Sequence, residues 1–268
     1  GLISFFKTLQ NVEFRYAIPQ EDSYGRTHPL TGERIAVLQD VVSLDPAWTR
    51  PPDPILEARF QRVKAKLMGF VSDPPQTLRT YPIADNTVPA RYARAYAWHR
   101  SAYPEKALEE VDSLLSSAPK DPYFLELKGQ ILLESGRPQD ALPVLREANQ
   151  ISLSQPLIAA LFGHALIATE DKANLPEATR VLKAAVSKDN ENPFAWYQLG
   201  VVYEREGDVA RARLATAERY SLEGRPNLAL PNAEAAMVGI PKGSPDWIRA
   251  QDIAMAARGD LENQKRRR

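Results

Sequence analysis

A regularly spaced helix-start signal runs through the middle of the chain. Asp121-Pro122, Gln155-Pro156 and Asn192-Pro193 each place a polar residue directly before a proline, and the three prolines are 34 and 37 residues apart. The polar side chain suits a helix N-cap, and proline suits the first helical position, where its missing N–H costs no hydrogen bond. A unit of this length that begins each time with a helix restricts the chain to an architecture of repeated helical units.

Two sets of small residues follow the same period. The first set is separated by 34, 34 and 37 residues and consists of Ala95, Gly129, Gly163 and Gly200. The second set is separated by 34, 37 and 34 residues and consists of Ala107, Ala141, Ala178 and Ala212. One three-residue insertion in the turn around residues 170–175 explains each departure from 34, which is the period of the tetratricopeptide repeat (TPR).

The residue types inside the repeat suit pairs of packed helices. We expect the glycine or alanine of the first helix to let the second helix approach closely and to meet the alanine of that helix. Large residues one turn later fill the remaining volume, namely Trp98, Leu132, Leu166 and Tyr203. Residues 196–203 carry the complete W-x-x-L-G-x-x-Y pattern of a TPR. The sequence therefore predicts an all-α fold, a TPR helical-hairpin solenoid preceded by an irregular helical segment.

The period divides the chain into four stretches. Residues 1–50 are expected to hold helices near residues 1–10 and 31–42, with a polar loop between them. Residues 51–87 are expected to form a linking helix that ends near Val71, and then a proline-rich connection. Residues 88–225 contain the four repeats. Residues 226–268 are expected to be capping helices, near residues 227–238 and 246–258, with a basic tail. No segment has the period-two pattern of a β-strand.

Charge and composition limit the kind of partner. Lys and Arg together number 34, as do Asp and Glu, so the formal net charge is zero. Nucleic-acid-binding proteins usually have a strong basic bias, and the one basic run, residues 265–268, is expected to be a solvated terminus. The chain has no cysteine and no apolar stretch of the ~18 residues that a membrane span needs. The expected partner is therefore a protein or an unfolded polypeptide, not nucleic acid.

Three strings outside the repeat pattern resemble a known family. They are GLISFFKTL at residues 1–9, YGRTHPLTGERI at residues 24–35, and AERY at residues 217–220 followed by GSPDWIRAQDI at residues 243–253. Together they resemble the C-terminal part of periplasmic zinc metallopeptidases with TPR domains, the BepA-like branch of the HtpX and CAAX-prenyl-protease superfamily. The resemblance covers essentially the whole chain. It implies a periplasmic location, and it implies that residues 1–50 are the closing helices and loop of a metallopeptidase domain.

The catalytic segment of that family is absent from this sequence. His28, His99 and His164 stand alone, whereas a hydrolytic zinc site of this kind needs an H-E-x-x-H helix and a further carboxylate ligand. We therefore expect the chain to bind no cofactor and not to be an enzyme. The resemblance implies that zinc and metalloendopeptidase activity belong to a full-length parent. The chain starts at Gly1 without a signal peptide, as is expected for a processed or excised part of a longer protein.

His28 is the one residue that the resemblance links to zinc. In the resembled family the histidine of this loop can approach the catalytic metal from outside and hold the enzyme shut. A further imidazole in the open coordination position would exclude the attacking water. The alternative is a loop histidine before a proline that caps or packs locally.

The first helix of each repeat supplies the candidate peptide-binding groove. In TPR arrays the groove is lined from positions two, five, nine and twelve of this helix. Here these positions hold Tyr92, Tyr96, His99, Tyr123, Glu126, Gln130, Leu133, Leu157, Ala160, His164, Ile167, Phe194, Tyr197, Val201 and Glu204. Aromatic side chains give a large contact area with a polar handle. The absence of Lys, Arg and Asn disfavours a clamp for acidic chaperone tails. The groove is either open to a partner or filled by the chain's own terminal segments.

The leading hypothesis is a protein-binding TPR scaffold of a periplasmic zinc metallopeptidase. Such a scaffold would hold envelope or outer-membrane proteins, or outer-membrane protein assembly machinery, for proteolysis or quality control. The alternative is a free-standing TPR adaptor without protease activity. A hydrolase in its own right lacks any nucleophile–base or metal constellation in this sequence.

Overall fold

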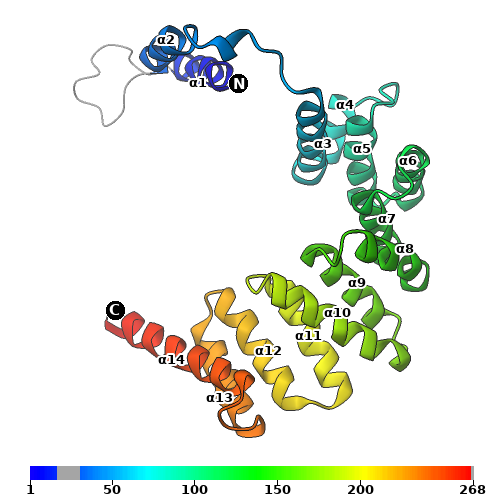
Figure 1. The fold of residues 1–268 in the computed structure, drawn as a ribbon, viewed down its shortest axis with the longest axis vertical. Coiled ribbons are helices and arrows are strands. Elements are labelled where there is room, and N and C mark those ends of the chain that lie inside the picture. The colour runs from blue at the N-terminus through cyan, green and yellow to red at the C-terminus, as the bar shows by residue number, and fades with distance from the viewer. Residues whose placement is uncertain (17–30, 267–268) are drawn as a thin grey trace. The chain divides into compact units, whose positions relative to one another are not determined.

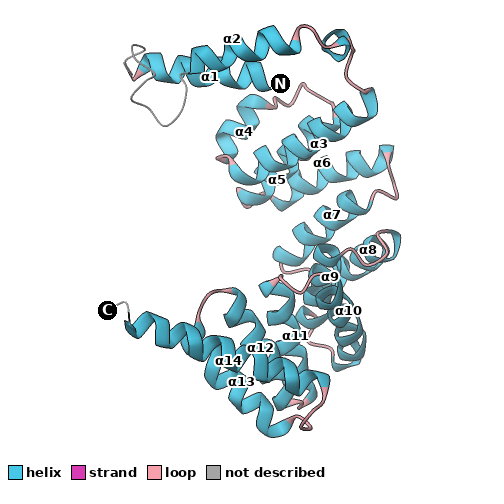
Figure 2. Ribbon diagram, turned by 60° about the vertical axis from the view of Figure 1, so that its left-hand side comes forward, coloured by secondary structure: helices cyan, strands magenta, loops and turns pink. Residues whose placement is uncertain are grey.

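The computed structural model describes residues 1–16 and 31–266 of the chain. These residues form fourteen α-helices and no β-strand (Figures 1 and 2). The chain divides into two compact units, residues 1–60 and 61–268. His28 and the T-H-P-L string of the proposed zinc-switch loop lie outside the described residues.

The first unit contains a pair of helices that pack on each other. Helix α1 (Leu2–Arg15) is longer than expected from the sequence, and α2 (Thr31–Val42) has the expected bounds. The hydroxyl of Thr31 donates a hydrogen bond to the carboxylate of Glu13, and Ile35 is buried between the helices. The guanidinium of Arg34 lies 5.8 Å from the centroid of the Phe6 ring. A 3-10 turn, η2 (Pro46–Thr49), follows with Asp45 as its N-cap.

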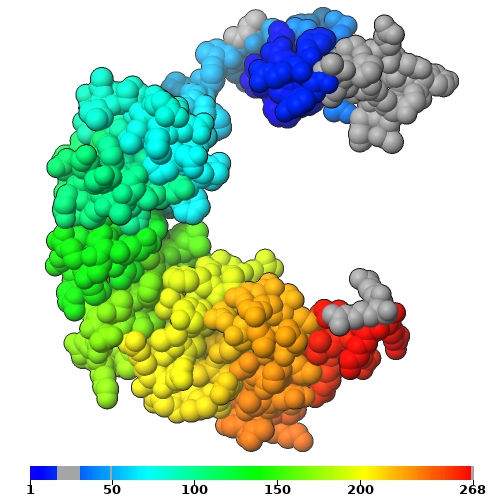
Figure 3. Space-filling view, turned by 180° about the vertical axis from the view of Figure 1, so that it is seen from behind, coloured from blue at the N-terminus to red at the C-terminus, as the bar shows by residue number. Residues whose placement is uncertain are grey.

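The second unit is a stack of helical hairpins. Helix α3 (Pro54–Val71) contains the boundary between the units, and α4 (Pro74–Thr80) follows it. The remaining helices are α5 (Val88–Arg100), α6 (Pro104–Ser117), α7 (Pro122–Glu134), α8 (Pro138–Ile151), α9 (Pro156–Ala168), α10 (Leu175–Lys188), α11 (Pro193–Glu206), α12 (Val209–Leu222), α13 (Pro226–Gly239) and α14 (Pro245–Arg266). Each odd-numbered helix from α5 onward packs on the helix that follows it, and neighbouring hairpins contact each other. The surface of this unit curves from the cyan helices to the orange ones around a hollow (Figure 3).

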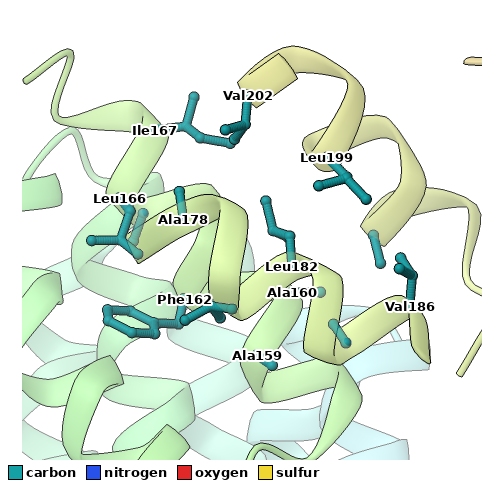
Figure 4. Packing of buried hydrophobic residues seen from close by; sticks show 14 of the residues in the cluster. Ala159, Ala160, Phe162, Leu166, Ile167, Ala178, Leu182, Val186, Leu199 and Val202 are labelled. Atoms are coloured by element: carbon teal, nitrogen blue, oxygen red, sulfur yellow. The ribbon is translucent and has the colours of Figure 1, made fainter. Parts of the chain in front are cut away.

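Interlocking apolar side chains join the central hairpins, from α7 to α12, into one large apolar cluster. In Figure 4, Leu182 of α10 lies among Phe162 and Leu166 of α9 and Leu199 of α11, all four of which are buried. The same cluster runs from α7 to α12, so each hairpin buries its apolar side against the next one. Because a single hairpin cannot bury this surface alone, the stack depends on nearest-neighbour contacts for its stability.

Two of the recurring glycines, Gly129 and Gly163, have leucines of the second helix as their nearest neighbours, whereas Gly200 faces Ala215 and Ala212. A Cβ added at Gly129 would lie 2.4 Å from the side chain of Leu145, and one at Gly163 would lie 2.5 Å from that of Leu182. In these two repeats the nearest neighbour is thus a leucine and not the expected alanine. The leucine lies one helical turn after that alanine, so its longer side chain fills the space that the glycine leaves. In the fourth repeat, by contrast, the expected Ala212 is among the nearest neighbours, with its carbonyl oxygen 3.6 Å from a Cβ at Gly200.

Two other segments differ from the sequence expectations. The proline-rich connection contains the short helix α4 in its first half. The last helix, expected to end near residue 258, continues to Arg266. The turn between α9 and α10, where the period predicts three extra residues, contains a 3-10 turn, η3 (Lys172–Asn174), capped by Asp171.

Buried Arg94 holds the proline-rich connection against the first hairpin. Its guanidinium donates hydrogen bonds to the carbonyl oxygens of Pro82 at 2.8 Å and Asp85 at 2.7 Å. It also donates to the carboxylate of Glu110 in α6 at 2.6 Å. A buried charge is tolerated only when it is paired and hydrogen-bonded in this way. The connection is thus fixed by α5 and α6 despite having little regular structure of its own.

Candidate protein-binding groove

Side-chain caps set the start of the first helix in each repeat. Asp121 Oδ1 accepts hydrogen bonds from the backbone N–H groups of Tyr123 at 3.0 Å and Phe124 at 3.2 Å. Gln155 and Asn192 cap α9 and α11 through the same two backbone positions. Because each helix starts at the same point of its repeat, positions two and five recur on one face of neighbouring first helices.

Helix α3 covers the groove at the first repeat. Tyr92 is 1% exposed and Tyr96 is 3% exposed. A Cβ added at Gly69 of α3 would lie 2.7 Å from the carbonyl oxygen of Ala93 and 3.0 Å from Cβ of Tyr96, so the two helices are in backbone contact there. Ala65, one turn earlier in α3, is fully buried. Small residues thus let α3 lie directly on α5, and this part of the groove is filled by the chain itself.

Arg62 of α3 fastens this helix to the second repeat. Its guanidinium carbon lies 4.2 Å from the centroid of the Phe124 ring and 5.6 Å from that of Tyr123. Both of its terminal nitrogens donate to the carboxylate of Asp121 at 2.6 Å. A planar guanidinium suits this combination, because it forms a bidentate pair with a carboxylate while its face stacks on an aromatic ring.

Lys66, one turn further along α3, is paired with the predicted groove residue Glu126. Its ammonium group lies 3.4 Å from Glu126 Oε2 and within 6.0 Å of the ring centroids of Tyr92, Tyr96 and Tyr123. Burial raises the pKa of Glu126, and the charge and hydrogen bond of Lys66 oppose that rise. The carboxylate of Glu126 is therefore already paired with Lys66 of the same chain.

A polar network lies where α3 ends. His99 Nε2 is 2.8 Å from Glu134 Oε2, and the Gln130 amide donates to Glu134 Oε1 at 2.8 Å. The hydrogen bond to His99 is the main reason that the pKa of Glu134 is lowered. The network borders a cleft of about 720 Å³ that also includes Tyr96, Arg100 and Phe70 of α3. His99 and Gln130 therefore both line this cleft.

His164 links this network to the fourth repeat. Its ring packs edge-on against Phe194, with 5.6 Å between the ring centroids. Burial lowers the pKa of His164, and the negative charge of Glu134 opposes this shift in part. Neutral imidazole is thus the favoured form, which suits a position between aromatic and aliphatic neighbours.

The third and fourth repeats present an uncovered apolar surface. Leu157 is 63% exposed, Phe194 42% and Tyr197 45%, and they come from the first helices α9 and α11, which lie side by side. Val201 is half-buried and Glu204 is exposed at the far end of α11. The guanidinium of Arg219 from α12 lies 5.1 Å from the Tyr197 ring. We call Leu157, Phe194 and Tyr197 the open row.

Several predicted groove positions belong to the core instead. Leu133 and Ile167 are 7% and 4% exposed and pack in the main apolar cluster, as does the fully buried Ala160. Near the end of α7 the residue that lines the cleft is Glu134, which directly follows the predicted position Leu133. Tyr123 is 45% exposed despite its contacts with Arg62 and Lys66.

Some residues of the groove were missed from the sequence. Arg62, Lys66 and Phe70 lie on α3, which is outside the repeats, and Glu134 and Arg219 lie outside the four expected positions. The repeat pattern carries no signal for the first three. The sequence offered one indirect indication of their role, because the residues that precede the solenoid must pack against some part of the protein.

Within residues 1–16 and 31–266, no group of three or more His, Cys, Asp or Glu side chains is placed to hold a metal ion. In those residues no helix has both the length and the hydropathy required to span a bilayer.

Comparisons with known proteins identify the repeats. Residues 92–152 and 168–229 match the family model described as tetratricopeptide repeat. A double mutant of MamA RS-1 (ArsTM) is 22% identical with a TM-score of 0.51, and the match covers 62% of this chain and 94% of that chain. YrrB, described as a TPR protein with an unusual peptide-binding site, is 21% identical with a TM-score of 0.50, covering 65% of this chain and 90% of that chain. No curated protein matches the chain. The predicted all-α TPR solenoid is confirmed.

Proposed function

We propose that the chain is the polypeptide-holding region of a BepA-like periplasmic zinc metallopeptidase. The observation that supports the holding role is the open row, because three large apolar side chains stay exposed on adjacent first helices while α3 covers the equivalent surface of the first repeat. Exposed aromatic and aliphatic side chains in a concave surface are typical of sites that bind other polypeptides. YrrB, with the same fold, is described as having a peptide-binding site.

The open row suits an unfolded or extended apolar segment more than a charged tail. Its neighbours in the groove are His164, whose neutral form is favoured, and half-buried Val201. A segment of an envelope or outer-membrane protein with alternating aromatic residues would place apolar side chains against the row. Its backbone would remain free to pair with polar groups at the groove edge.

Serine substitutions in the open row test the holding role. The triple variant Leu157→Ser, Phe194→Ser and Tyr197→Ser should weaken binding of a fluorescently labelled, unfolded outer-membrane β-barrel fragment by about tenfold or more, since hot-spot residues each contribute more than about 1 kcal/mol. The control carries Val238→Ser and Met255→Ser, at apolar positions of α13 and α14 that are 89% and 62% exposed. Equal affinity of the two variants would remove the open row from the proposal.

The link to a metallopeptidase rests on the three strings that resemble that family, and part of one lies outside the described residues. The coding sequence upstream of Gly1 tests the link directly. An H-E-x-x-H motif there supports the protease, and a start codon immediately before Gly1 supports the adaptor alternative instead. Residues 1–268 alone should bind no stoichiometric zinc by metal analysis and should cleave no casein, because the ligands belong to the parent.

A further inference from the structure

A small cleft lies between α11 and α12, directly beside Tyr197 of the open row. It has a volume of about 220 Å³, and its walls include Tyr197 and Glu204 of α11 and Arg213, Arg219 and Tyr220 of α12. We call it the α11–α12 cleft. All of these residues belong to the second compact unit. Because Tyr197 borders both surfaces, a polypeptide held on the open row would pass the mouth of this cleft.

Two tyrosine rings hold Arg219 in place within the α11–α12 cleft. Its guanidinium carbon lies 5.1 Å from the centroid of the Tyr197 ring and 4.3 Å from that of the Tyr220 ring. Its side chain is 22% exposed, about as buried as that of Arg62, which is 25% exposed. The attraction between a guanidinium and an aromatic ring involves its positive charge, so these contacts orient Arg219 without using its N–H donors.

The N–H donors of Arg219 have no hydrogen-bond acceptor in the part of the chain that the structure describes. Its Nε is buried without a hydrogen-bond partner, and its one ion-pair contact, to Glu223 Oε1, is 3.4 Å long. Its terminal nitrogens are not buried. Arg62, by contrast, donates two hydrogen bonds to the carboxylate of Asp121. A guanidinium that is mostly removed from water favours an acceptor for these donors.

The charges around Arg219 leave one positive charge uncompensated. The cleft and its rim hold three arginines, Arg213, Arg219 and Arg225, and two carboxylates, Glu204 and Glu223. Glu223 is shared, because it lies 3.4 Å from Arg219 and 3.6 Å from Arg225. One further carboxylate therefore neutralises the cleft. A run of acidic residues would be repelled by Glu204, which lines the same cleft.

We propose that Arg219 binds the side-chain carboxylate of an Asp or Glu residue in the segment that the open row holds. This inference rests on the proposed holding function and adds a sequence preference to it. The two terminal nitrogens of a guanidinium form a bidentate pair with one carboxylate. An extended chain rises about 3.3 Å per residue, and Arg219 is 5.1 Å from the Tyr197 ring. The acidic residue therefore lies within about two residues of the apolar residue that contacts Tyr197.

A set of end-blocked fluorescent peptides tests this preference. Each carries the same three apolar residues and one Glu, which is moved along the peptide, and each has a counterpart with Gln at that position. The full chain should bind the best Glu peptide at least about tenfold more tightly than its Gln counterpart at low salt, because a bidentate charged pair is added. The preference should shrink as the salt concentration rises.

Substitutions of Arg219 assign the preference to this residue. Arg219→Gln should bind both peptides as weakly as the wild type binds the Gln peptide. The control Arg180→Gln makes the same charge change at a side chain of α10 that is 72% exposed, and it should keep the preference. If Arg219→Gln disturbs the tyrosine contacts, Arg219→Lys provides the second variant. It keeps the charge and should still lose most of the preference, because lysine forms no bidentate pair.

The Gln peptide measures the open row separately from Arg219. Binding of the Gln peptide without any gain for Glu would overturn this inference and leave the proposed holding function in place, whereas binding of neither peptide would remove both. Full retention of the preference in either Arg219 variant would also overturn it, because the carboxylate would then bind elsewhere. A phosphoserine peptide that binds more tightly than the Glu peptide would identify phosphate as the ligand and contradict the carboxylate assignment.

Discussion

The guanidinium of Arg62 donates two hydrogen bonds to the carboxylate of Asp121, Nη1 to Oδ2 and Nη2 to Oδ1, each at 2.6 Å. Asp121 also caps α7 through the backbone N–H groups of Tyr123 and Phe124. One carboxylate therefore fixes both the start of a repeat and the helix that covers the repeat before it. Asp121 thus holds α3 over the groove at the first repeat and also caps the first helix of the second repeat.

Removing the guanidinium should loosen α3 while the solenoid stays folded. Arg62→Ala removes a bidentate charged pair, and hydrogen bonds to charged groups contribute about 1.5–3 kcal/mol. We expect faster amide hydrogen exchange in residues 62–71, and in α5 beneath them. Arg59→Ala, at an exposed position of the same helix, serves as the control and should exchange like the wild type. Unchanged exchange in Arg62→Ala would mean that other contacts hold α3.

The closest approach of α3 and α5 should not tolerate a side chain. A Cβ at Gly69 would meet backbone atoms of Ala93 at 2.7 and 3.0 Å, so Gly69→Ala must move one helix away from the other. Overpacking of this kind typically costs about 1–3 kcal/mol. At Gly259 of α14 a Cβ would meet nothing within 4 Å. Gly259→Ala should therefore raise stability by up to about 1 kcal/mol through helix propensity. Urea denaturation of the two variants gives the comparison.

The start of each repeat could be read from the sequence because it depends on local chemistry. Asp121, Gln155 and Asn192 cap their helices as their residue types predict, and the proline after each needs no hydrogen bond. The period between them follows from the packing of equal units. The capping residues lie within a few residues of the helix start, and the repeats recur at a nearly fixed spacing. A single sequence is therefore enough to detect both features.

The packing of α3 over the groove could not be predicted from the sequence in the same way. Tyr92 and Tyr96 occupy groove positions, yet they are buried because α3, from outside the repeats, lies over them. Hydrophobic periodicity would bury Val63 and Leu67 of α3 and expose its opposite side. The structure does the reverse. What decides the packing is the close backbone approach at Gly69, a tertiary contact that no repeat period encodes.

The glycines inside the repeats should differ in their tolerance of alanine. At Gly129 a Cβ would lie 2.4 Å from the side chain of Leu145, whereas at Gly200 the nearest atom, Cβ of Ala215, is 3.5 Å away. Gly129→Ala is expected to lower the free energy of unfolding by about 1–3 kcal/mol through overpacking. Gly200→Ala should be neutral or stabilising, because its Cβ has room and alanine favours the helix. Thermal denaturation of both variants checks the order, and a larger loss for Gly200→Ala would contradict it.

Acidification should weaken the solenoid through His164. Burial lowers the pKa of this imidazole below its usual 6.5, and Glu134 opposes the shift in part. The unfolded chain therefore binds a proton at a pH where the folded chain does not. Stability is fully present above pH 6.5 and is lost as the pH falls from there through the lowered pKa.

The loss of stability cannot exceed about 1.4 kcal/mol per pH unit for this one group. We expect the free energy of unfolding of the wild type to fall between pH 7 and pH 5 more than that of His164→Gln, measured by urea denaturation at each pH. Glu134, whose lowered pKa contributes stability above pH 4.5 that is lost on further acidification, acts in a lower window. The difference between the two proteins isolates the histidine, since every other titrating group is common to both. Identical pH profiles would show that His164 is as accessible to protons in the folded groove as in the unfolded chain.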